Sequence, residues 1–316
     1  MKRRPYSYMG PLAFIVGMLL LYRFAILPGR SPVSSLAETV VQTDGDDFSC
    51  TFDGISHDVI LDLPEEPAGA ALILMLHGYG NSAESFRADT GFEKDAIGRG
   101  YAVAYVTGAP DPNDATSAAG WNSGVGDSPN RDVDFLDTLA QYLQAAYKLD
   151  KKRTFVVGFS NGAFMAHRLA VEDPDTFAAV VSVAGMMPES IWESCGGAEY
   201  APAGLFQITG EKDDVVPKHS DGSAKYAKAP AIEDVVDYYV STNGLILLDT
   251  VDVGKKAVLS KFGVSGDAPA GTSKGGSRQV WNLFIGDGRH SWPDESTTGI
   301  DINTLILDYL DTESAK

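Results

Sequence analysis

Thr154-Phe155-Val156-Val157-Gly158-Phe159-Ser160-Asn161-Gly162-Ala163 is the stretch that decides the expected fold. Its first residues form an apolar, β-branched run that favours a buried strand, and its last residues begin a helix-forming run. Between them stands Gly-x-Ser-x-Gly. A sharp strand-to-helix turn has no room for side chains at Gly158 and Gly162, and it presents the serine hydroxyl above the edge of a sheet. Ser160 is therefore the first candidate for a nucleophile.

Apolar runs on both sides of this turn alternate with helical patterns. Strands are expected within residues 71–76, 101–106, 177–184, 205–208 and 250–262, and helices within 82–97, 132–148, 235–240 and 304–310. This alternation predicts the α/β class, with a mainly parallel sheet covered by helices on both faces. Residues 48–63 are expected to form an N-terminal β-hairpin that turns at Asp53-Gly54. With the serine turn at its centre, this pattern is typical of the α/β-hydrolase fold.

A serine hydroxyl becomes a useful nucleophile only when an imidazole takes its proton and a carboxylate orients that imidazole. In this fold the chain order is serine, acid, histidine. Downstream of Ser160 stand His167, His219 and His290. We expect His167, on the helix that Ser160 opens, to point away from the hydroxyl, and His219 lies in a loop. His290 follows an apolar strand and a glycine turn, so it is the candidate base.

The candidate acids follow the expected strand at 205–208. They are Glu211, Asp213 and Asp214, which lie together in the loop after that strand. Asp213 is favoured, but spacing alone does not separate it from Asp214. The acids that are not used are expected to be solvated.

Ester hydrolysis also places negative charge on the carbonyl oxygen, which main-chain N–H groups must stabilise. One donor is expected from Asn161, the residue after the nucleophile, and the other from the loop after an early strand. The apolar run 71–76 is followed by His77-Gly78-Tyr79-Gly80, and the Tyr79 N–H is the second candidate. A plain turn at this sequence is the weaker interpretation, because strand, loop and serine turn occur in the expected order.

The chain resembles a known group, the secreted esterases related to polyhydroxybutyrate depolymerases and to feruloyl and acetylxylan esterases. The shared segments run from about His77 to Trp292 and comprise His77-Gly78-Tyr79-Gly80, Gly120-Trp121-Asn122, Asp132-Val133-Asp134-Phe135-Leu136, 158–166, Val183-Ala184-Gly185, 213–217 and His290-Ser291-Trp292-Pro293. The resemblance implies an α/β-hydrolase fold and identifies Asp213 as the acid. It also implies that His77, Gly78, Trp121 and Trp292 border the substrate.

Two segments depart from the pattern of that group. Its members often carry a cysteine before the Gly-Trp pair, where this chain has Ala118-Ala119, and their acid loop often opens with His-Gly, where this chain has Thr209-Gly210. These changes affect the disulfide pattern and the subfamily. They leave the three candidate catalytic side chains in place.

Composition limits the classes of function. The chain has 316 residues, 44% of them hydrophobic, and a formal net charge of −18. It is long enough for one α/β domain with a sizeable core. Because so acidic a body repels phosphate backbones, no nucleic-acid partner is expected.

The first residues carry an export signal. Lys2, Arg3 and Arg4 precede an apolar run over 9–27 that only Arg23 interrupts. This arrangement is typical of a secretory signal peptide, and it also fits an uncleaved membrane anchor. We expect residues 1–37 to be signal or anchor with a short spacer and 38–316 to be a single catalytic domain outside the cytoplasm, with membrane contact only through the first segment.

Cys50 and Cys195 are the two cysteines. An exported chain favours a disulfide between them, and two buried thiols are the alternative. Two cysteines cannot form a zinc site unaided, and Asp44-Gly45-Asp46-Asp47 lacks the rest of a calcium-binding loop. Neither a metal nor another cofactor is expected.

The sequence therefore predicts an exported serine esterase without a cofactor. Its substrates are expected to be small or polymeric esters, either feruloyl or acetyl groups on plant polysaccharides or hydroxyalkanoate esters. One alternative is a surface protein that keeps this fold for binding alone. A serine peptidase is a weaker alternative, because the chain shows no propeller or lid domain. No apolar lid segment is visible, so short or aromatic acyl groups are expected rather than long fatty chains.

Overall fold

The computed structural model describes residues 31–126, 128–195, 203–216, 218, 229–264 and 278–314. The expected export segment up to residue 30 lies outside them, as do His219 and residues 265–277. Among the helices of the described residues, none is long and apolar enough to span a bilayer.

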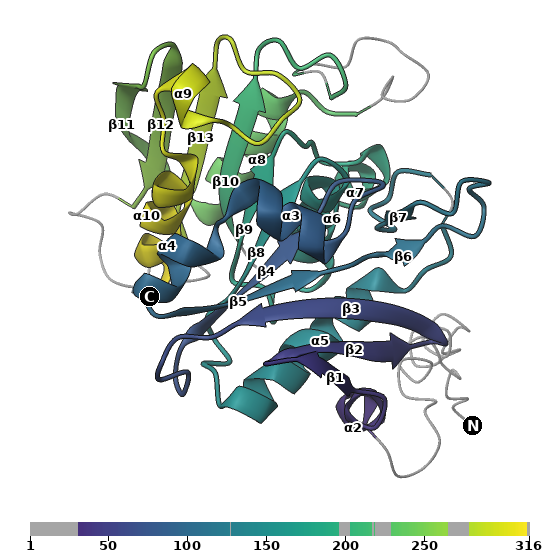
Figure 1. The fold of residues 1–316 in the computed structure, drawn as a ribbon. Coiled ribbons are helices and arrows are strands. Elements are labelled where there is room, and N and C mark those ends of the chain that lie inside the picture. The colour runs from purple at the N-terminus through teal and green to yellow at the C-terminus, as the bar shows by residue number, and fades with distance from the viewer. Residues whose placement is uncertain are drawn as a thin grey trace, which may run out of the picture.

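The described strands form one large sheet and a small ribbon. Their bounds are β1 (Val41–Asp44), β2 (Asp47–Phe52), β3 (Ile55–Asp62), β4 (Ala71–Leu76), β5 (Tyr101–Val106), β6 (Ala109–Pro110), β7 (Ala119–Gly120), β8 (Thr154–Phe159), β9 (Ala179–Val183), β10 (Gly204–Gly210), β11 (Ile246–Val253), β12 (Ala257–Gly263) and β13 (Val280–Ile285). The large sheet has the order β1-β2-β3-β5-β4-β8-β9-β10-β13-β12-β11, and β6 pairs with β7 (Figure 1). From β5 to β13 all neighbours are parallel, and both flanks are antiparallel.

Helices cover both faces of this sheet. The described helices are α2 (Pro32–Ala37), α3 (Ala83–Thr90), α4 (Glu93–Gly98), α5 (Asp132–Tyr147), α6 (Asn161–Glu172), α7 (Glu189–Cys195), α8 (Ile232–Asn243), α9 (Glu295–Thr298) and α10 (Ile302–Ser314). Alternate residues of β4 serve two cores: Leu72 and Leu74 pack with α5, α6 and α8, whereas Ile73 and Met75 pack with α3, α4 and α10. The central strands are apolar throughout because both of their faces are covered. The predicted α/β-hydrolase architecture is confirmed.

Two local predictions compare differently with the structure. The hairpin turns at Asp53-Gly54 as expected, with φ of 49° and 80° at the two residues. The single helix expected within 82–97 is instead two helices. Gly91, at φ 54°, caps the C-terminus of α3, and α4 begins at Glu93. A left-handed residue cannot continue a helix, so the chain turns there.

The expected disulfide is wrong, because Cys50 and Cys195 are both free and buried. Cys50 lies on β2 and Cys195 ends α7. Burial away from water raises the pKa of the Cys50 thiol to about 12, so it packs as a small apolar side chain. The cellular compartment predicts the redox chemistry available to thiols but not their positions in the fold.

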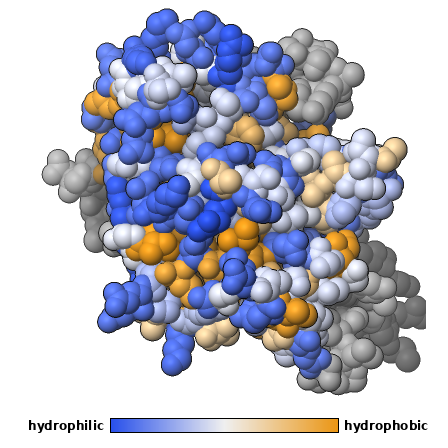
Figure 2. All heavy atoms as spheres, viewed as in Figure 1, coloured by the Kyte–Doolittle hydropathy of each residue, from blue (hydrophilic) through white to orange (hydrophobic). Residues whose placement is uncertain are grey.

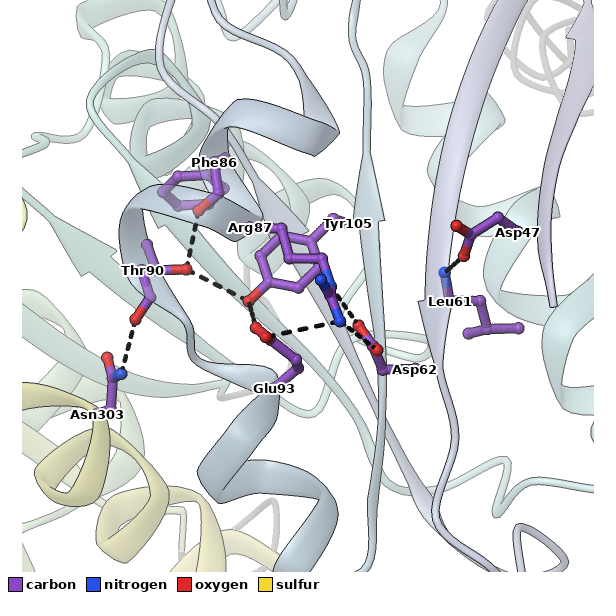
Figure 3. A network of polar contacts seen from close by, with 9 residues as sticks. All are labelled: Asp47, Leu61, Asp62, Phe86, Arg87, Thr90, Glu93, Tyr105 and Asn303. Carbon is purple, nitrogen blue, oxygen red and sulfur yellow. Dashed lines mark hydrogen bonds and ion pairs between the residues drawn. The ribbon is translucent and has the colours of Figure 1, made fainter. Parts of the chain in front are cut away.

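A polar network, buried at Tyr105 and Glu93 and partly exposed at Arg87 and Asp62, fixes α3 and α4 to the sheet (Figure 3). Arg87 binds both oxygens of Asp62, at 2.8 and 2.7 Å, and lies 3.6 Å from Glu93. The hydroxyl of Tyr105, on β5, donates to Glu93 at 2.9 Å. The two-pronged Arg87–Asp62 pair is the strong kind of ion pair, and it orients both short helices.

One face of the molecule is largely polar. On the face shown in Figure 2, hydrophilic residues predominate and hydrophobic residues form smaller groups between them. Surface ion pairs include that of Arg99 with Asp308 and Asp311, at 2.7 and 2.8 Å. Such exposed pairs contribute little stability each, but the strong net charge favours solubility.

Candidate active site

Ser160 lies at the turn between β8 and α6. Its φ of 52° and ψ of −116° fall outside the regions that most side chains adopt. A Cβ on Gly158 would lie 2.2 Å from the Gly162 oxygen, and one on Gly162 would lie 2.1 Å from the Leu76 oxygen. Both glycines are therefore required by the close approach of main chains. The strained turn is the geometry expected of a serine that is presented to a cavity.

Two hydrogen bonds connect three of the predicted side chains. Ser160 Oγ lies 2.9 Å from His290 Nε2, and His290 Nδ1 lies 2.9 Å from Asp213 Oδ2. An ionised carboxylate only accepts, so Nδ1–H donates to Asp213 and the unprotonated Nε2 faces the serine hydroxyl. Asp213 Oδ1 accepts from the main-chain N–H groups of Val215 and Val216 at 2.9 and 2.7 Å. This arrangement can transfer the serine proton to the imidazole.

The structure places only one of the three candidate acids against His290. The side chain of Asp213 is 1% exposed, whereas Glu211 and Asp214 are exposed to solvent. The difference follows from the Asp213 bonds to main-chain N–H groups, which turn its carboxylate inward. Burial thus separates two neighbouring aspartates that spacing left open.

The other two candidate histidines are not part of this group. His167 lies on α6, fully buried, with Nε2 at 3.1 Å from Gln207 Oε1, so it points into the core as expected. Burial lowers its pKa to about 4 and keeps the ring neutral. His219 lies outside the described residues.

The acid loop (211–216) and the base loop (286–292) are joined by main-chain contacts. The Lys212 N–H donates to the Gly288 carbonyl oxygen at 2.8 Å. A Cβ on Gly210 would lie 2.5 Å from that same oxygen. The parallel pairing of β10 with β13 brings the two loops to the same sheet edge, and the glycine contact lets them close on each other.

The candidate oxyanion donors are the main-chain N–H groups of Tyr79 and Asn161. Both residues line the cavity at Ser160. Within the described part of the chain, no hydrogen bond occupies either of these N–H groups. For Asn161 this follows from its place as the first residue of α6, where N–H groups have no partner in the helix. Both donors are available to an anionic oxygen.

A cavity of about 500 Å³ opens at Ser160 and His290. Its lining combines aromatic and aliphatic side chains with polar ones: Tyr79, Val125, Phe159, Phe164 and Val215, and Asn81, Asp111, Ser128 and Asn130. Gly78 and Trp121, for which the resemblance implies a place beside the substrate, also line it. No Lys or Arg is among the described residues that line it.

His77 lies behind this cavity and does not line it. The ring is fully buried: Nδ1 donates to the Gly78 carbonyl oxygen at 2.7 Å, and Nε2 accepts from the Gly108 N–H at 2.9 Å. Burial lowers the pKa of the imidazole, and the neutral ring satisfies both bonds. The structure thus gives His77 a role in tying two loops together, where the resemblance implied contact with substrate.

The two predicted tryptophans differ in position. Trp121 lines the cavity and donates its ring N–H to the His77 carbonyl oxygen at 2.9 Å. Trp292 is not among the residues that line it; its indole packs edge-on against Phe86, at 5.6 Å between ring centres, and donates to Asn303. The structure therefore does not bring Trp292 to the cavity of Ser160.

The side chain of Asn161 was missed by sequence reasoning, which considered only its main chain. Asn161 Oδ1 accepts from the Trp121 N–H at 2.7 Å, and Nδ2 donates to the Trp121 carbonyl oxygen and to Ser123 Oγ at 3.2 and 3.1 Å. These bonds attach the long loop (108–130) to the helix that begins at the nucleophile. A polar residue directly after the serine was the only available signal.

Asp132 attaches the same loop from its other side. This buried carboxylate accepts from the Asn122 N–H at 2.6 Å, while Arg168 donates to the Asn122 carbonyl oxygen. Burial raises the pKa of Asp132 to about 6, although the bond from Asn122 and the nearby Arg168 oppose the shift. The buried acid thus serves to fix a main-chain segment next to the cavity.

The family model described as "Serine hydrolase (FSH1)" matches residues 70–233, more than half of the chain. The chain belongs to this family of serine hydrolases. The matched range includes the serine turn, residues 77–80 and the acid loop, and it stops before His290.

Individual proteins that are similar to this chain carry the name esterase. NocK of Nocardia uniformis subsp. tsuyamanensis, which carries the name esterase, is 36% identical over 178 residues, or 54% of this chain and 47% of its own. Feruloyl esterase B of Talaromyces stipitatus is 31% identical over 134 residues, 42% of this chain and 36% of its own. The chain thus spans about half or less of the length of these relatives. An acetyl xylan esterase structure from Aspergillus awamori shares the fold, with a TM-score of 0.54 at 12% identity over 81% of this chain and 94% of its own.

Proposed function

We propose that this protein hydrolyses carboxylic esters through an acyl-enzyme formed on Ser160. The observation that carries the proposal is the pair of 2.9 Å hydrogen bonds from Ser160 through His290 to Asp213. Membership of a serine hydrolase family and relatives that carry the name esterase support it. The free N–H groups of Tyr79 and Asn161 are the proposed oxyanion donors.

The first half of the reaction forms the acyl-enzyme. Ser160 Oγ attacks the ester carbonyl while its proton moves to His290 Nε2, and Asp213 stabilises the resulting imidazolium. The carbonyl oxygen becomes an oxyanion that accepts from the Tyr79 and Asn161 N–H groups. When the tetrahedral intermediate collapses, the bond to the alcohol oxygen breaks and His290 gives its proton to that oxygen.

The second half restores the enzyme. Water attacks the acyl carbon as His290 Nε2 takes one of its protons, and the same two N–H groups stabilise the new oxyanion. Collapse of this intermediate breaks the bond to Ser160 Oγ, which recovers its proton from His290. The products are the free acid and the alcohol, and no cofactor enters the cycle.

The proposed substrates are acyl esters of polysaccharide fragments, with feruloyl or acetyl groups, or hydroxyalkanoate esters. The mixed lining of the cavity supports the first class. Tyr79 is 51% exposed and offers a ring face, and the half-buried Asn81, Asp111 and Asn130 offer hydrogen-bonding groups to a sugar. Because no described cationic side chain balances Asp111, an uncharged sugar suits the cavity better than one that carries a carboxylate.

A panel of esters tests the substrate class. We expect higher kcat/KM for acetyl or feruloyl esters of a neutral sugar than for the methyl esters of hydroxybutyrate oligomers or for long-chain fatty esters. Asp111→Asn is expected to narrow the difference in kcat/KM between a neutral sugar ester and its uronic-acid counterpart. Asp114→Asn is the control on the same loop. Faster turnover of polyester fragments would favour the second proposed class, the hydroxyalkanoate esters, and faster turnover of long-chain lipids would overturn both classes.

Export and a single catalytic domain belong to the same proposal. The basic cluster at Lys2, Arg3 and Arg4 and the apolar run after it support delivery of residues 38–316 outside the cytoplasm, with 1–37 as signal or anchor. Fractionation of cells that express the full chain tests this. Recovery of the activity in the cytoplasm would contradict it.

The central test compares the wild type with Ser160→Ala on p-nitrophenyl acetate. We expect turnover to fall by a factor on the order of 10³ or more, because the nucleophile is lost while the fold remains. Ser241→Ala, on the exposed surface of α8, is the control and should retain full activity. An inert wild type would favour a binding protein, and faster cleavage of peptides than of esters would favour a peptidase.

A further inference from the structure

Trp292 and Asn303 connect the base loop to two helices on one face of the sheet. The Trp292 ring N–H donates to Asn303 Oδ1 at 3.1 Å, and Asn303 Nδ2 donates to the Thr90 carbonyl oxygen at 2.9 Å. Asn303 belongs to α10 and Thr90 ends α3. Figure 3 shows the Asn303 amide reaching Thr90 from the neighbouring helix. One amide side chain therefore joins the loop that carries His290 to both helices.

Thr90 is itself held firmly. Its hydroxyl donates to the Phe86 carbonyl oxygen at 2.9 Å and lies 3.2 Å from the hydroxyl of Tyr105, which donates to Glu93 (Figure 3). Tyr105 is fully buried on the central sheet. The anchor that Asn303 reaches is thus part of the buried network and not of a mobile surface.

Aromatic side chains connect Trp292 to the imidazole of His290 through ring contacts. The Phe86 ring packs edge-on against Trp292 and lies 6.4 Å from the ring centre of Phe159. The Phe159 ring lies 5.3 Å from the imidazole of His290. Phe86 therefore contacts both the residue that supports the base loop and the ring that packs against the base.

His290 lies between two fixed points. Before it, Gly288 is bound to the acid loop through its carbonyl oxygen and through its contact with Gly210. After it, Trp292 is bound to Asn303. We propose that Trp292 and Asn303 are positioning residues that keep His290 at hydrogen-bond distance from Ser160, and that Trp292 does not bind substrate. This inference rests on the proposed esterase activity.

The expected effect is on the chemical step. Displacement of a catalytic group by about 1 Å can cost about 10²-fold in rate, and loss of one hydrogen bond from a support loosens the loop without removing it. We therefore expect a loss of about tenfold in kcat with KM nearly unchanged. A residue that contacts substrate would instead raise KM.

The experiment uses Trp292→Phe, Asn303→Leu and the double variant in the full chain, with p-nitrophenyl acetate and a larger feruloyl ester. Phe keeps a ring against Phe86 but lacks the N–H, and Leu removes the acceptor. Each single variant should lower kcat about tenfold on both esters, and the double variant should lose little more, because both changes break the same hydrogen bond between Trp292 and Asn303. Asn303→Asp, which keeps an acceptor for the indole, should recover part of the rate.

Trp281→Phe is the matched control. Trp281 also donates its ring N–H to an amide oxygen, that of Gln279 at 2.9 Å, but it lies on β13 within the core. Its loss should leave kcat within about twofold of the wild type. Labelling of Ser160 by a small sulfonyl fluoride provides a second readout, because it requires no binding at the cavity rim; its rate should fall in Trp292→Phe by the same factor as kcat.

Five results would overturn the inference. A rise in KM with unchanged kcat and unchanged labelling in Trp292→Phe would show that the indole contacts substrate. Fully additive losses in the double variant, or an equal loss in Trp281→Phe, would show that the effect comes from general destabilisation. A wild type that is inert toward both esters overturns the proposed function and this inference together, whereas an active wild type that matches its variants overturns only the inference.

Discussion

The long loop (108–130) and the pair of acid and base loops (211–216 and 286–292) all contribute to the lining of the Ser160 cavity, but they are held in different ways. Main-chain hydrogen bonds and a contact between two glycines join the acid and base loops. The long loop is held mainly by side chains, those of Asn161 and Asp132 above all. Backbone geometry thus holds the acid and base loops, which position the proposed chemistry. Replaceable side chains hold the long loop, which is suited to choosing the substrate.

The largest effect is expected where the acid and base loops touch. In Gly288→Ala, the added Cβ would lie 2.8 Å from the Gly210 Cα, so the loops must separate and the Asp213–His290 bond must stretch. We expect kcat/KM to fall by about 10³-fold, with a stability loss of about 1–3 kcal/mol. Gly98→Ala on α4, where a Cβ meets nothing within 4 Å and φ is not positive, is the control. Equal losses of kcat/KM in both variants would contradict the special role of the contact between the acid and base loops.

The second prediction concerns the buried imidazole of His167, which is bound to Gln207 on β10. His167 has a pKa lowered to about 4 by burial, against 6.5 in the unfolded chain, so the unfolded state binds the proton first. Stability from this group is present above pH 6.5 and is lost as the pH falls toward 4. The difference in unfolding free energy between the wild type and His167→Gln should therefore rise by about 3 kcal/mol from pH 4 to pH 7 in urea titrations. A constant difference would show that the ring is solvated.

Asp132, which holds the long loop, should give the unfolding free energy a pH dependence of the opposite sign. Burial raises its pKa to about 6, above the ordinary 3.8, so the native state holds the proton more tightly. Its contribution to stability is complete below pH 3.8 and is lost as the pH rises through 6. Relative to Asp132→Asn, the wild type should lose roughly 2–3 kcal/mol between pH 4 and pH 7. The same urea titrations measure it, and a wild type that instead gains stability over this range would contradict the assignment.

The smallest effect is expected from Asn161→Ala. The variant keeps the main-chain N–H that we propose as an oxyanion donor but loses three side-chain bonds to Trp121 and Ser123. We expect KM to rise about tenfold while kcat changes less, because the loop that lines the cavity is loosened and the catalytic group is not. If kcat instead falls about a hundredfold while KM stays unchanged, the side chain acts on the chemistry itself.

The parts that sequence reasoning predicted share one property: they depend on local geometry. The serine turn requires glycine at position 158, where an added Cβ would lie 2.2 Å from the Gly162 oxygen, and the buried strands require apolar residues on both faces, so both leave signals in the order of residues. The single helix expected within 82–97 is wrong at Gly91, where a left-handed cap ends α3.

What the sequence could not predict depends on contacts between distant segments. Spacing could not separate Asp213 from Asp214, although the family resemblance implied Asp213, because the choice is decided by which carboxylate meets His290, 77 residues away. Trp292 carries an aromatic side chain that suits a substrate cleft, yet its hydrogen-bond partner is Asn303 on α10. The free cysteines follow from packing, which residue type and compartment do not determine.

The most direct test of the proposed mechanism is to trap the acyl-enzyme. Rapid mixing of the wild type with p-nitrophenyl acetate, acid quenching and peptide mass spectrometry should find one acetyl group, on Ser160, and His290→Ala should accumulate it far more slowly. Release of p-nitrophenol by the wild type with no acetyl group on Ser160, or with the group on another residue, would contradict the account.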